Sequence, residues 1–230
     1  NPDHGIEKYC FAKPNDTYLV YLPDGGTSSL DLRDASGKYT AFYSPYPLSG
    51  RDFLVSAERG GADTEIPLPE GQSMMAPKIE ARMLQALAIK PGDKVLEVGT
   101  GSGYLTACLD WLSDEVTSVE IFESLSTQAQ EHLAAFGILD AKLIVDDVFT
   151  HEFNSLFDVI AVTGSLPTPT DRFEKLLANG GRLFQVVGQG ASARAQLVTR
   201  VADEIFHREE LFETALPALI NAPEPERFVF

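Results

Sequence analysis

The 230-residue sequence is poor in cysteine and in basic residues, and it lacks a long apolar run. Its two cysteines, Cys10 and Cys108, are far apart and no Cys-x-x-Cys pair occurs, so neither a disulfide framework nor a redox motif is indicated. No stretch approaches the roughly 20 apolar residues of a membrane span, and no signal-peptide pattern is visible. We therefore expect a cytoplasmic protein.

Basic residues are outnumbered, 18 against 34 acidic ones, which gives a formal net charge of −16. A surface of this charge repels phosphate backbones and anionic lipids, so we expect no nucleic-acid and no membrane partner. Metal-ligand spacing is also missing, because the four histidines are scattered, and we assign no metal. Apolar residues make up 44% of the chain, enough to bury a full core.

One glycine-rich turn organises the rest of the sequence. The apolar run that begins at Lys94 leads into Gly99, Gly101 and Gly103, and a helical pattern follows directly. Glycines permit positive φ and keep Cβ atoms away from a ligand, while a helix start offers unpaired backbone N–H groups. A strand, a glycine turn and a helix in this order predict a site for a nucleotide-type cofactor.

The residues around the turn narrow the choice of cofactor. A dinucleotide site needs a third glycine where this chain has Tyr104, so a nicotinamide oxidoreductase is disfavoured. Glu97, at the end of the strand, would repel a pyrophosphate but suits a cation. Glu120 ends the next strand, where a carboxylate can accept bonds from both hydroxyls of a ribose. These features predict S-adenosyl-L-methionine, a cationic adenosyl ligand without phosphate.

From Lys94 onward, predicted strands and helices alternate with short connections. This pattern predicts an α/β fold with a doubly wound, mostly parallel sheet, closed by a terminal hairpin of 195–201 and 205–216. A helix before the first of these strands should cover about 77–89. The other strands are expected at 94–99, 115–120, 141–146, 157–163 and 182–188, and the helices at about 103–112, 123–136 and 169–178, with Gly137 and Gly180 as C-terminal caps.

The first 60 residues have a different character. Strand patterns at 18–22, 30–32 and 39–43 alternate with turns and predict a small β-meander. The run 58–63 is typical of a flexible linker. We therefore predict a β-rich N-terminal segment over 1–60 and a second domain over 64–230.

The second domain resembles the protein-L-isoaspartate O-methyltransferase family. The resemblance rests on five segments in matching order: 71–77, 95–104, 116–120, 157–164 and 177–183. It implies a seven-stranded Rossmann-like sheet and an S-adenosylmethionine-dependent carboxyl methylation of L-isoaspartyl residues, a protein-repair reaction. The implied partner is a protein or peptide with an isoaspartyl carboxylate, and the oligomeric state stays open.

The N-terminal segment has a resemblance of its own. The runs 9–14 and 18–26 are similar to a collagen-binding β-domain of glycoside-hydrolase-like proteins. The likeness covers about residues 5–50 and departs at 44–48, so no binding residues are carried over. The isoaspartate family usually has a helical segment in this place.

The resemblance also implies a set of cofactor contacts. Asp146 keeps an acid that would lie by the adenine amine, although Val145 and Asp147 replace the glycines of the family's Gly-Asp-Gly turn. The full set of expected cofactor residues is Glu97, Gly99, Thr100, Gly101, Ser102, Gly103, Tyr104, Glu120, Ile121, Asp146 and Asp147.

The acceptor site departs from the family. A carboxylate needs no enzymic nucleophile or base to attack a methyl group, so the protein supplies donors, alignment and exclusion of water. The family uses a Thr-Ile-Ser type loop, but this chain has Ser73-Met74-Met75, which puts Met75 at the key serine position. Either isoaspartyl methylation is weak and would rise on Met75→Ser, or Ser73, Gln72 and Thr163 act as the donors.

Three readings therefore remain open. The first is the isoaspartyl methyltransferase. The second is a methyltransferase of the same fold with a different acceptor, which Met75 and the unusual N-terminus motivate. The third is a non-catalytic cofactor-binding or adhesion module led by the β-meander, against which the glycine turn with Glu97 and Glu120 argues.

Overall fold

The computed structural model describes residues 18–21, 27–30, 65–113, 115–135 and 137–225. The chain forms two compact units. One comprises Asn1–Glu65 with Ala76–Ala88, and the other comprises Ile66–Met75 with Ile89–Phe230. Among the described residues, no helix is both long and apolar enough to cross a membrane.

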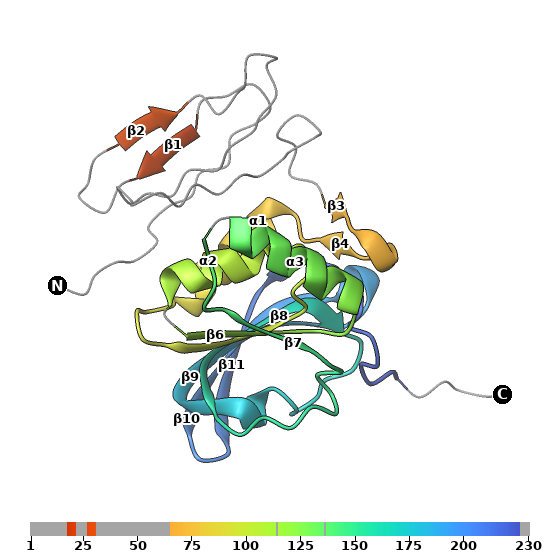
Figure 1. Cartoon of the computed structure of the whole chain (residues 1–230). Coiled ribbons are helices and arrows are strands. Elements are labelled where there is room, and N and C mark those ends of the chain that lie inside the picture. The colour runs from red at the N-terminus through yellow and green to blue at the C-terminus, as the bar shows by residue number, and fades with distance from the viewer. Residues whose placement is uncertain (1–17, 22–26, 31–64, 114, 136, 226–230) are drawn as a thin grey trace. The chain divides into compact units, whose positions relative to one another are not determined.

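In the first unit, the described residues form a strand pair and one helix. β1 (Tyr18–Tyr21) runs antiparallel to β2 (Thr27–Leu30), in agreement with the first predicted strand (Figure 1). The third predicted strand, 39–43, the linker 58–63 and most of the segment with the collagen-binding likeness lie outside the described residues. α1 (Pro77–Leu87) begins with proline in its first turn and ends at Ala88, whose positive φ of 45° closes the helix.

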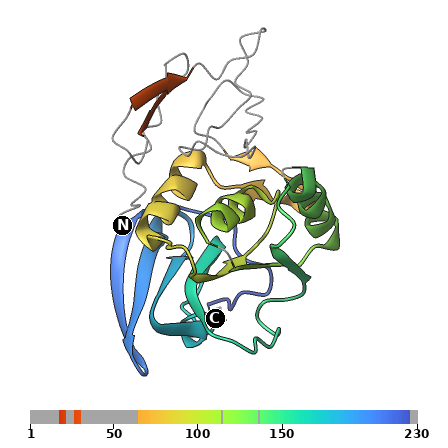
Figure 2. The ribbon, with the colours of Figure 1, turned by 60° about the vertical axis from the view of Figure 1, so that its left-hand side comes forward.

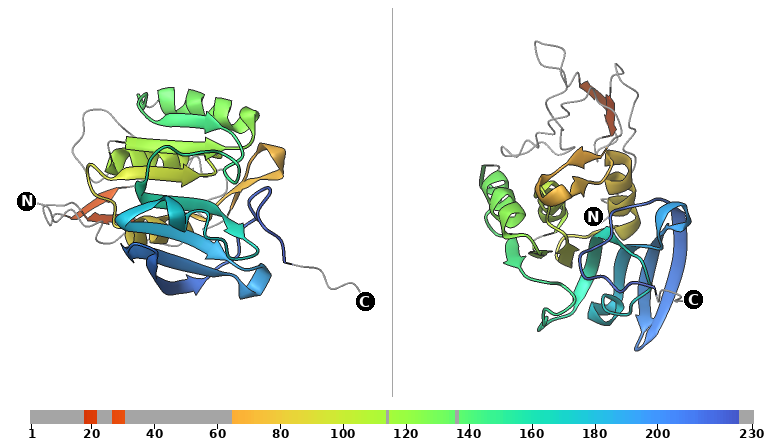
Figure 3. Two further views of the ribbon diagram at one scale, coloured as in Figure 1. Left: turned by 90° about the horizontal axis from the view of Figure 1, so that it is seen from below. Right: turned by 90° about the vertical axis from the view of Figure 1, so that its right-hand side faces the viewer.

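The second unit is built on the predicted seven-stranded sheet, with strand order β11-β10-β9-β8-β5-β6-β7 (Figure 3). The strands are β5 (Lys94–Val98), β6 (Glu115–Glu120), β7 (Lys142–Val145), β8 (Phe157–Leu166), β9 (Leu177–Val187), β10 (Arg194–Ala202) and β11 (Ile205–Glu213). The first five strands are parallel, and β10 is antiparallel to both of its neighbours. β10 and β11 form the predicted terminal hairpin, which extends along one edge of the sheet (Figure 2).

Two helices lie on the same side of this sheet, α2 (Tyr104–Leu112) and α3 (Glu123–Ala135) (Figure 1). Gly103 lets them approach, because a Cβ on this residue would lie only 3.1 Å from the Cβ of Ala129. Gly137 ends α3 as predicted, with a φ of 74° and its N–H donating to Ala134 at 3.0 Å.

The helix predicted over 169–178 is wrong. The structure has only a 3-10 turn, Glu174–Leu176, and β9 already begins at Leu177. Pro167 and Pro169 disfavour helical conformation at their neighbours, and Leu177 is fully buried and pairs with Phe157 in the sheet. Gly180 is consequently no helix cap. It lies within β9, where the pairing jumps from Leu177 to Arg182 and the intervening residues bulge out.

The chain order of the sheet sets the location of a ligand site. The chain runs outward from β5 through β6 to β7 and then returns to β8 on the other side of β5. Ligands of open α/β sheets bind at such a switch point, beyond the carboxyl ends of the strands. A small hairpin of β3 (Ile66–Pro67) and β4 (Ser73–Met74), with a 3-10 turn over Pro69–Gly71, contributes to the same pocket.

Candidate active site

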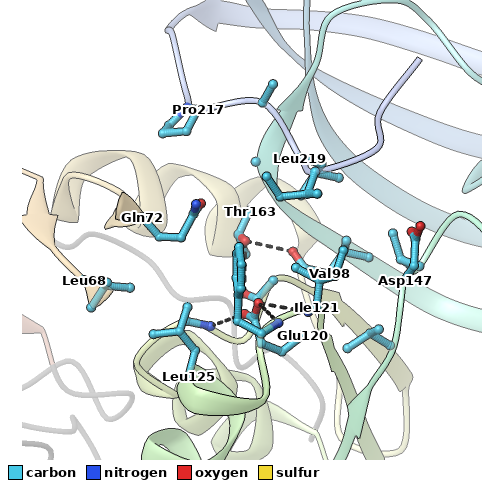
Figure 4. Close-up of a pocket in the computed structure, with 18 of the residues that line it drawn as sticks. Leu68, Gln72, Val98, Glu120, Ile121, Leu125, Asp147, Thr163, Pro217 and Leu219 are labelled. Atoms are coloured by element: carbon cyan, nitrogen blue, oxygen red, sulfur yellow. Dashed lines mark hydrogen bonds between the residues drawn. The ribbon is translucent and has the colours of Figure 1, made fainter. Parts of the chain in front are cut away.

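A pocket opens beyond the carboxyl ends of β5, β6 and β8 (Figure 4). Three parts of the second unit surround it. The glycine-turn side comprises Gly99, Gly101, 119–122, Leu125 and 146–148; the hairpin side comprises Leu68, Gln72 and Ser73; and the C-terminal wall comprises 217–220. Thr163 and Gly164, at the end of β8, and Val98 lie between them.

The glycine turn has no room for side chains. Gly99, Gly101 and Gly103 all have positive φ, at 92°, 54° and 81°. A Cβ on Gly99 would lie 2.3 Å from the Thr163 Oγ1, well inside contact distance. Glycine therefore lets the backbone turn tightly at the start of α2, and the backbone of Gly99 and Gly101 lines the pocket.

Thr163 holds this turn from the neighbouring strand. Its Oγ1 lies 2.8 Å from the Val98 carbonyl oxygen and 3.0 Å from that of Gly99 (Figure 4). The one hydroxyl proton of a threonine is therefore directed at the backbone of β5. This geometry supports a role of Thr163 in holding the turn more than its predicted role as a hydrogen-bond donor to the carboxylate that is methylated.

Glu120 presents a fixed carboxylate to the pocket. Its Oε2 accepts from the Gly101 N–H at 3.0 Å, and its Oε1 accepts from the N–H groups of Ile121 and Phe122 at 2.9 and 3.1 Å (Figure 4). The residue is 5% exposed. Because a carboxylate has about four acceptor positions, it can still accept from a ligand hydroxyl while these three bonds fix its orientation.

Glu97 does not line the pocket. It is fully buried beneath the turn, where its Oε2 accepts from Thr106 at 2.5 Å and from Ser118 at 2.6 Å, while its Oε1 has no partner. Burial raises the pKa of Glu97 from 4.5 to about 8, so the side chain is mostly neutral at pH 7. This placement disagrees with the expectation that Glu97 contacts a cationic cofactor. The sequence could not show this, because a lone acid at the end of a strand gives no sign of whether it is buried.

Asp146 and Asp147 line the pocket after β7. The Asp146 Oδ2 lies 2.7 Å from the His151 Nδ1. This hydrogen bond is the largest cause that lowers the pKa of Asp146, and the bond from the Asp147 N–H is the next. Asp147 accepts from Asn221 at 2.9 Å, which ties the loop to the chain just beyond the C-terminal wall. Neither Val145 nor Asp147 has a positive φ, so this loop does not use the conformation for which a Gly-Asp-Gly turn supplies glycine.

The hairpin side places Gln72 and Ser73 in the pocket but not Met75. Met75 is 6% exposed and belongs to the buried apolar residues. The Gln72 Nε2 donates to the Glu70 carbonyl at 3.2 Å, and a primary amide has a second N–H for another acceptor. Across the pocket, the C-terminal wall is fixed to β8, because Ser165 donates to Pro217 and accepts from Leu219 at 2.8 and 3.0 Å.

The side chains that line the pocket fit an adenosyl group without phosphate. Three are acidic, Glu120, Asp146 and Asp147, and none of the described lining residues is lysine or arginine. A pyrophosphate would meet only like charge here, whereas a sulfonium cation would not. Val98, Ile121 and Val148 add apolar surface for a base.

Comparison with known proteins settles the family. Residues 52–220 match the sequence model of the Protein-L-isoaspartate(D-aspartate) O-methyltransferase family. The chain belongs to this family. A Protein-L-isoaspartate O-methyltransferase of Geobacter metallireducens is 35% identical over 156 residues, covering 67% of this chain and 72% of its own. One from Magnetococcus marinus is 36% identical over 169 residues, covering 71% and 73%.

A solved structure shares the isoaspartate methyltransferase fold. A Plasmodium falciparum protein described as a putative protein-L-isoaspartate O-methyltransferase, solved in complex with S-adenosyl-L-homocysteine, superposes with a TM-score of 0.62 at 24% identity. The match covers 71% of this chain and 83% of its own. The predicted family, fold, enzyme class and S-adenosylmethionine cofactor are thereby confirmed.

The isoaspartate methyltransferase fold brings together most, but not all, of the predicted site residues. Gln72, Ser73, Thr163, Gly99, Gly101, Glu120, Ile121, Asp146 and Asp147 line one pocket. Thr100, Ser102, Gly103 and Tyr104 instead form the frame of the turn: Thr100 bonds to Ser118 at 2.6 Å, and the Tyr104 N–H donates to Ser102 at 3.3 Å.

Sequence reasoning missed the C-terminal wall and Leu68. The apolar run at 216–220 was a usable signal, because exposed apolar residues that lie together can mark a ligand site. Nothing in the local sequence says that they return to β8.

Proposed function

We propose that the protein methylates the free carboxylate of isoaspartyl residues in damaged proteins, using S-adenosylmethionine. The observation that supports this most is that one pocket joins the Glu120 carboxylate and the glycine turn to Gln72 and Ser73 on the hairpin side. The cytoplasmic location expected from the sequence is part of the same proposal.

The glycine-turn side would hold the cofactor. Glu120 would accept from the ribose hydroxyls, the backbone of Gly99 and Gly101 would lie against the ligand, and Asp146 would accept from the adenine amine. When bound, S-adenosylmethionine supplies a methyl group on a positively charged sulfur. Transfer of this methyl group to the acceptor oxygen gives a methyl ester on the acceptor and a neutral thioether on the cofactor.

The hairpin side would hold the acceptor. Its carboxylate is already anionic, so the chain need not remove a proton, and hydrogen bonds from Gln72 and Ser73 would align it for attack. Leu68, Pro217 and Leu219 line the same space and would exclude water. Thr163 would act indirectly, by fixing the backbone of the glycine turn.

The deciding experiment measures methyl transfer from labelled S-adenosylmethionine to an isoaspartyl peptide and to its aspartyl twin. We expect a base-labile methyl ester on the isoaspartyl peptide only. Methylation of both peptides would show an acceptor site that does not read the isoaspartyl linkage.

A second candidate is a methyltransferase with a different acceptor. It is favoured by one observation, that the family's serine position is Met75 and that this side chain is buried outside the pocket. Cofactor binding without methylation of either peptide would support it.

A further inference from the structure

Arg172 lies outside the pocket and donates hydrogen bonds to the loop that lines it. Its Nε and Nη2 donate to the Val148 carbonyl at 3.0 and 2.9 Å, and Nη2 also donates to the His151 carbonyl. The guanidinium carbon lies 5.7 Å from the centre of the Phe153 ring. One partly buried cation thus satisfies two carbonyls and packs on an aromatic ring.

The loop that Arg172 contacts, 147–151, is a single helical turn. The N–H groups of Thr150 and His151 donate to the Asp147 carbonyl at 3.0 and 2.8 Å, and that of Phe149 donates to the Asp147 Oδ1 at 2.9 Å. The last carbonyls of a helical turn have no partner within it, and a cationic side chain is a good cap for them. Arg172 serves as that cap from a distant segment.

The other end of this turn faces the pocket. Asp146, Asp147 and Val148 line it, and Val148 is only 7% exposed. The His151 ring in turn bonds to the Asp146 carboxylate at 2.7 Å. By fixing the carbonyls of Val148 and His151, Arg172 therefore fixes both the apolar contact and the acid that the loop presents.

We propose that Arg172 is a positioning residue for the cofactor, acting through the turn at 147–151. This inference rests on the proposed function, because it places the adenine end of the cofactor against Asp146 and Val148. Lysine is a poor replacement, because its compact ammonium group lacks the planar fork that directs two N–H groups at the Val148 carbonyl and a third at the His151 carbonyl.

The test uses the full chain and S-adenosyl-L-homocysteine in calorimetry, comparing wild type with Arg172→Ala and Arg172→Lys. The matched control is Arg200→Ala, since Arg200 also donates to a carbonyl, that of Leu177 at 2.6 Å, but neither Arg200 nor Leu177 lines the pocket. Losing charged hydrogen bonds predicts a Kd about tenfold higher for Arg172→Ala and nearly unchanged for Arg200→Ala.

Two further readouts separate positioning from general stability. Without ligand, the amides of 147–151 should exchange faster with solvent in Arg172→Ala but not in Arg200→Ala. With the isoaspartyl peptide, KM for S-adenosylmethionine should rise while kcat changes little, because Arg172 touches no reacting atom.

The possible results are distinct. If wild type fails to bind S-adenosyl-L-homocysteine, the proposed function itself fails. If wild type binds and a folded Arg172→Ala binds equally well, only the role of Arg172 is overturned. Should Arg172→Ala not fold, Arg172→Lys decides, because unchanged affinity in that variant would equally refute the inference.

Discussion

Glu97 is the residue at which local sequence and buried environment conflict most. It belongs to a short strand that is buried at four of its five positions, and only two hydroxyls reach its carboxyl group. Desolvation therefore dominates these hydrogen bonds, and the pKa is raised to about 8. A neutral acid beneath the turn keeps the polar contacts to Thr106 and Ser118 without burying a net charge.

This raised pKa predicts a pH-dependent stability. A carboxyl whose folded-state pKa exceeds its unfolded value stabilises the fold fully below pH 4.5, and this contribution is lost as the pH rises towards 8. Wild type should thus lose stability between pH 5 and 8, by on the order of a few kcal/mol, and Glu97→Gln should lose less. Urea unfolding at several pH values measures both.

Parallel stability curves for the two proteins would contradict the raised pKa. Asp146 and Asp171 do not interfere in this window, because their pKa values are lowered from 3.8 and their contributions are lost only in stronger acid.

Gly99 offers a second test at a single position. Gly99→Ala adds a Cβ that meets the Thr163 hydroxyl at 2.3 Å, in a backbone with a φ of 92°. Gly92→Ala is the matched control, because its φ of 86° imposes similar strain but its Cβ meets nothing within 4 Å. We expect Gly92→Ala to cost about 1 kcal/mol of stability and to leave S-adenosyl-L-homocysteine binding intact, and Gly99→Ala to weaken both.

The cause of the difference can be isolated with Thr163→Ala, which removes the clashing oxygen. The double variant Gly99→Ala/Thr163→Ala should be more stable than the sum of the two single changes predicts. Simple additivity would show that the contact between these residues is not what excludes a side chain at Gly99.

At the scale of elements, the sheet was predictable and the exceptions have physical causes. Short apolar runs between turn signals located every strand of the sheet, and the largest error is at the start of β9, predicted at 182 and found at Leu177. The segment 169–178 failed because it has an apolar spacing similar to that of a helix, while two prolines and the pairing of Leu177 with Phe157 favour β9. Thr100, Ser102, Gly103 and Tyr104 do not line the pocket beside Gly99 and Gly101, because adjacent residues in a tight turn point in different directions. Their predicted contact with the cofactor stays a prediction.

β4, together with Met75 just after it, gives the prediction for this scale. Ser73 lines the pocket, whereas Met75 is buried outside it. Of the two positions that the sequence left open, this favours Ser73 as the hydrogen-bond donor to the substrate carboxylate. Ser73→Ala should lower kcat for an isoaspartyl peptide by roughly 10²–10³-fold, the usual loss for one aligned donor. Met75→Ser should bring no gain and should destabilise the fold by about 1–3 kcal/mol. A clear rise in activity for Met75→Ser would mean that position 75 reaches the acceptor.

At the scale of the whole molecule, the acidic balance of the chain and the acidity of the pocket favour the same ligands. The net charge of −16 disfavours anionic partners in general, and the described pocket residues contain acids without a lysine or arginine to balance them. This combination was partly visible in the sequence through Glu120 and the missing third glycine. What the sequence could not show is that Glu97, the other acid near the turn, is buried and mostly neutral.

Ligand-dependent stability tests this picture directly. We expect S-adenosylmethionine and S-adenosyl-L-homocysteine to bind with micromolar Kd, on the order of −8 kcal/mol, and NAD not to bind. At 100 times the Kd, either adenosyl ligand should stabilise the fold by about 2.7 kcal/mol and raise Tm by about 5–10 °C. NAD at the same concentration should leave Tm unchanged, because its pyrophosphate would meet Glu120, Asp146 and Asp147 with no cation among the described lining residues.

Glu120→Ala should keep the Tm of the free protein within a few degrees. It should lose most of the rise in Tm that the adenosyl ligands cause, since a charged acceptor is worth roughly 1.5–3 kcal/mol. An equal rise in Tm with NAD, or a full rise in Glu120→Ala, would show that the pocket recognises its ligand by other groups.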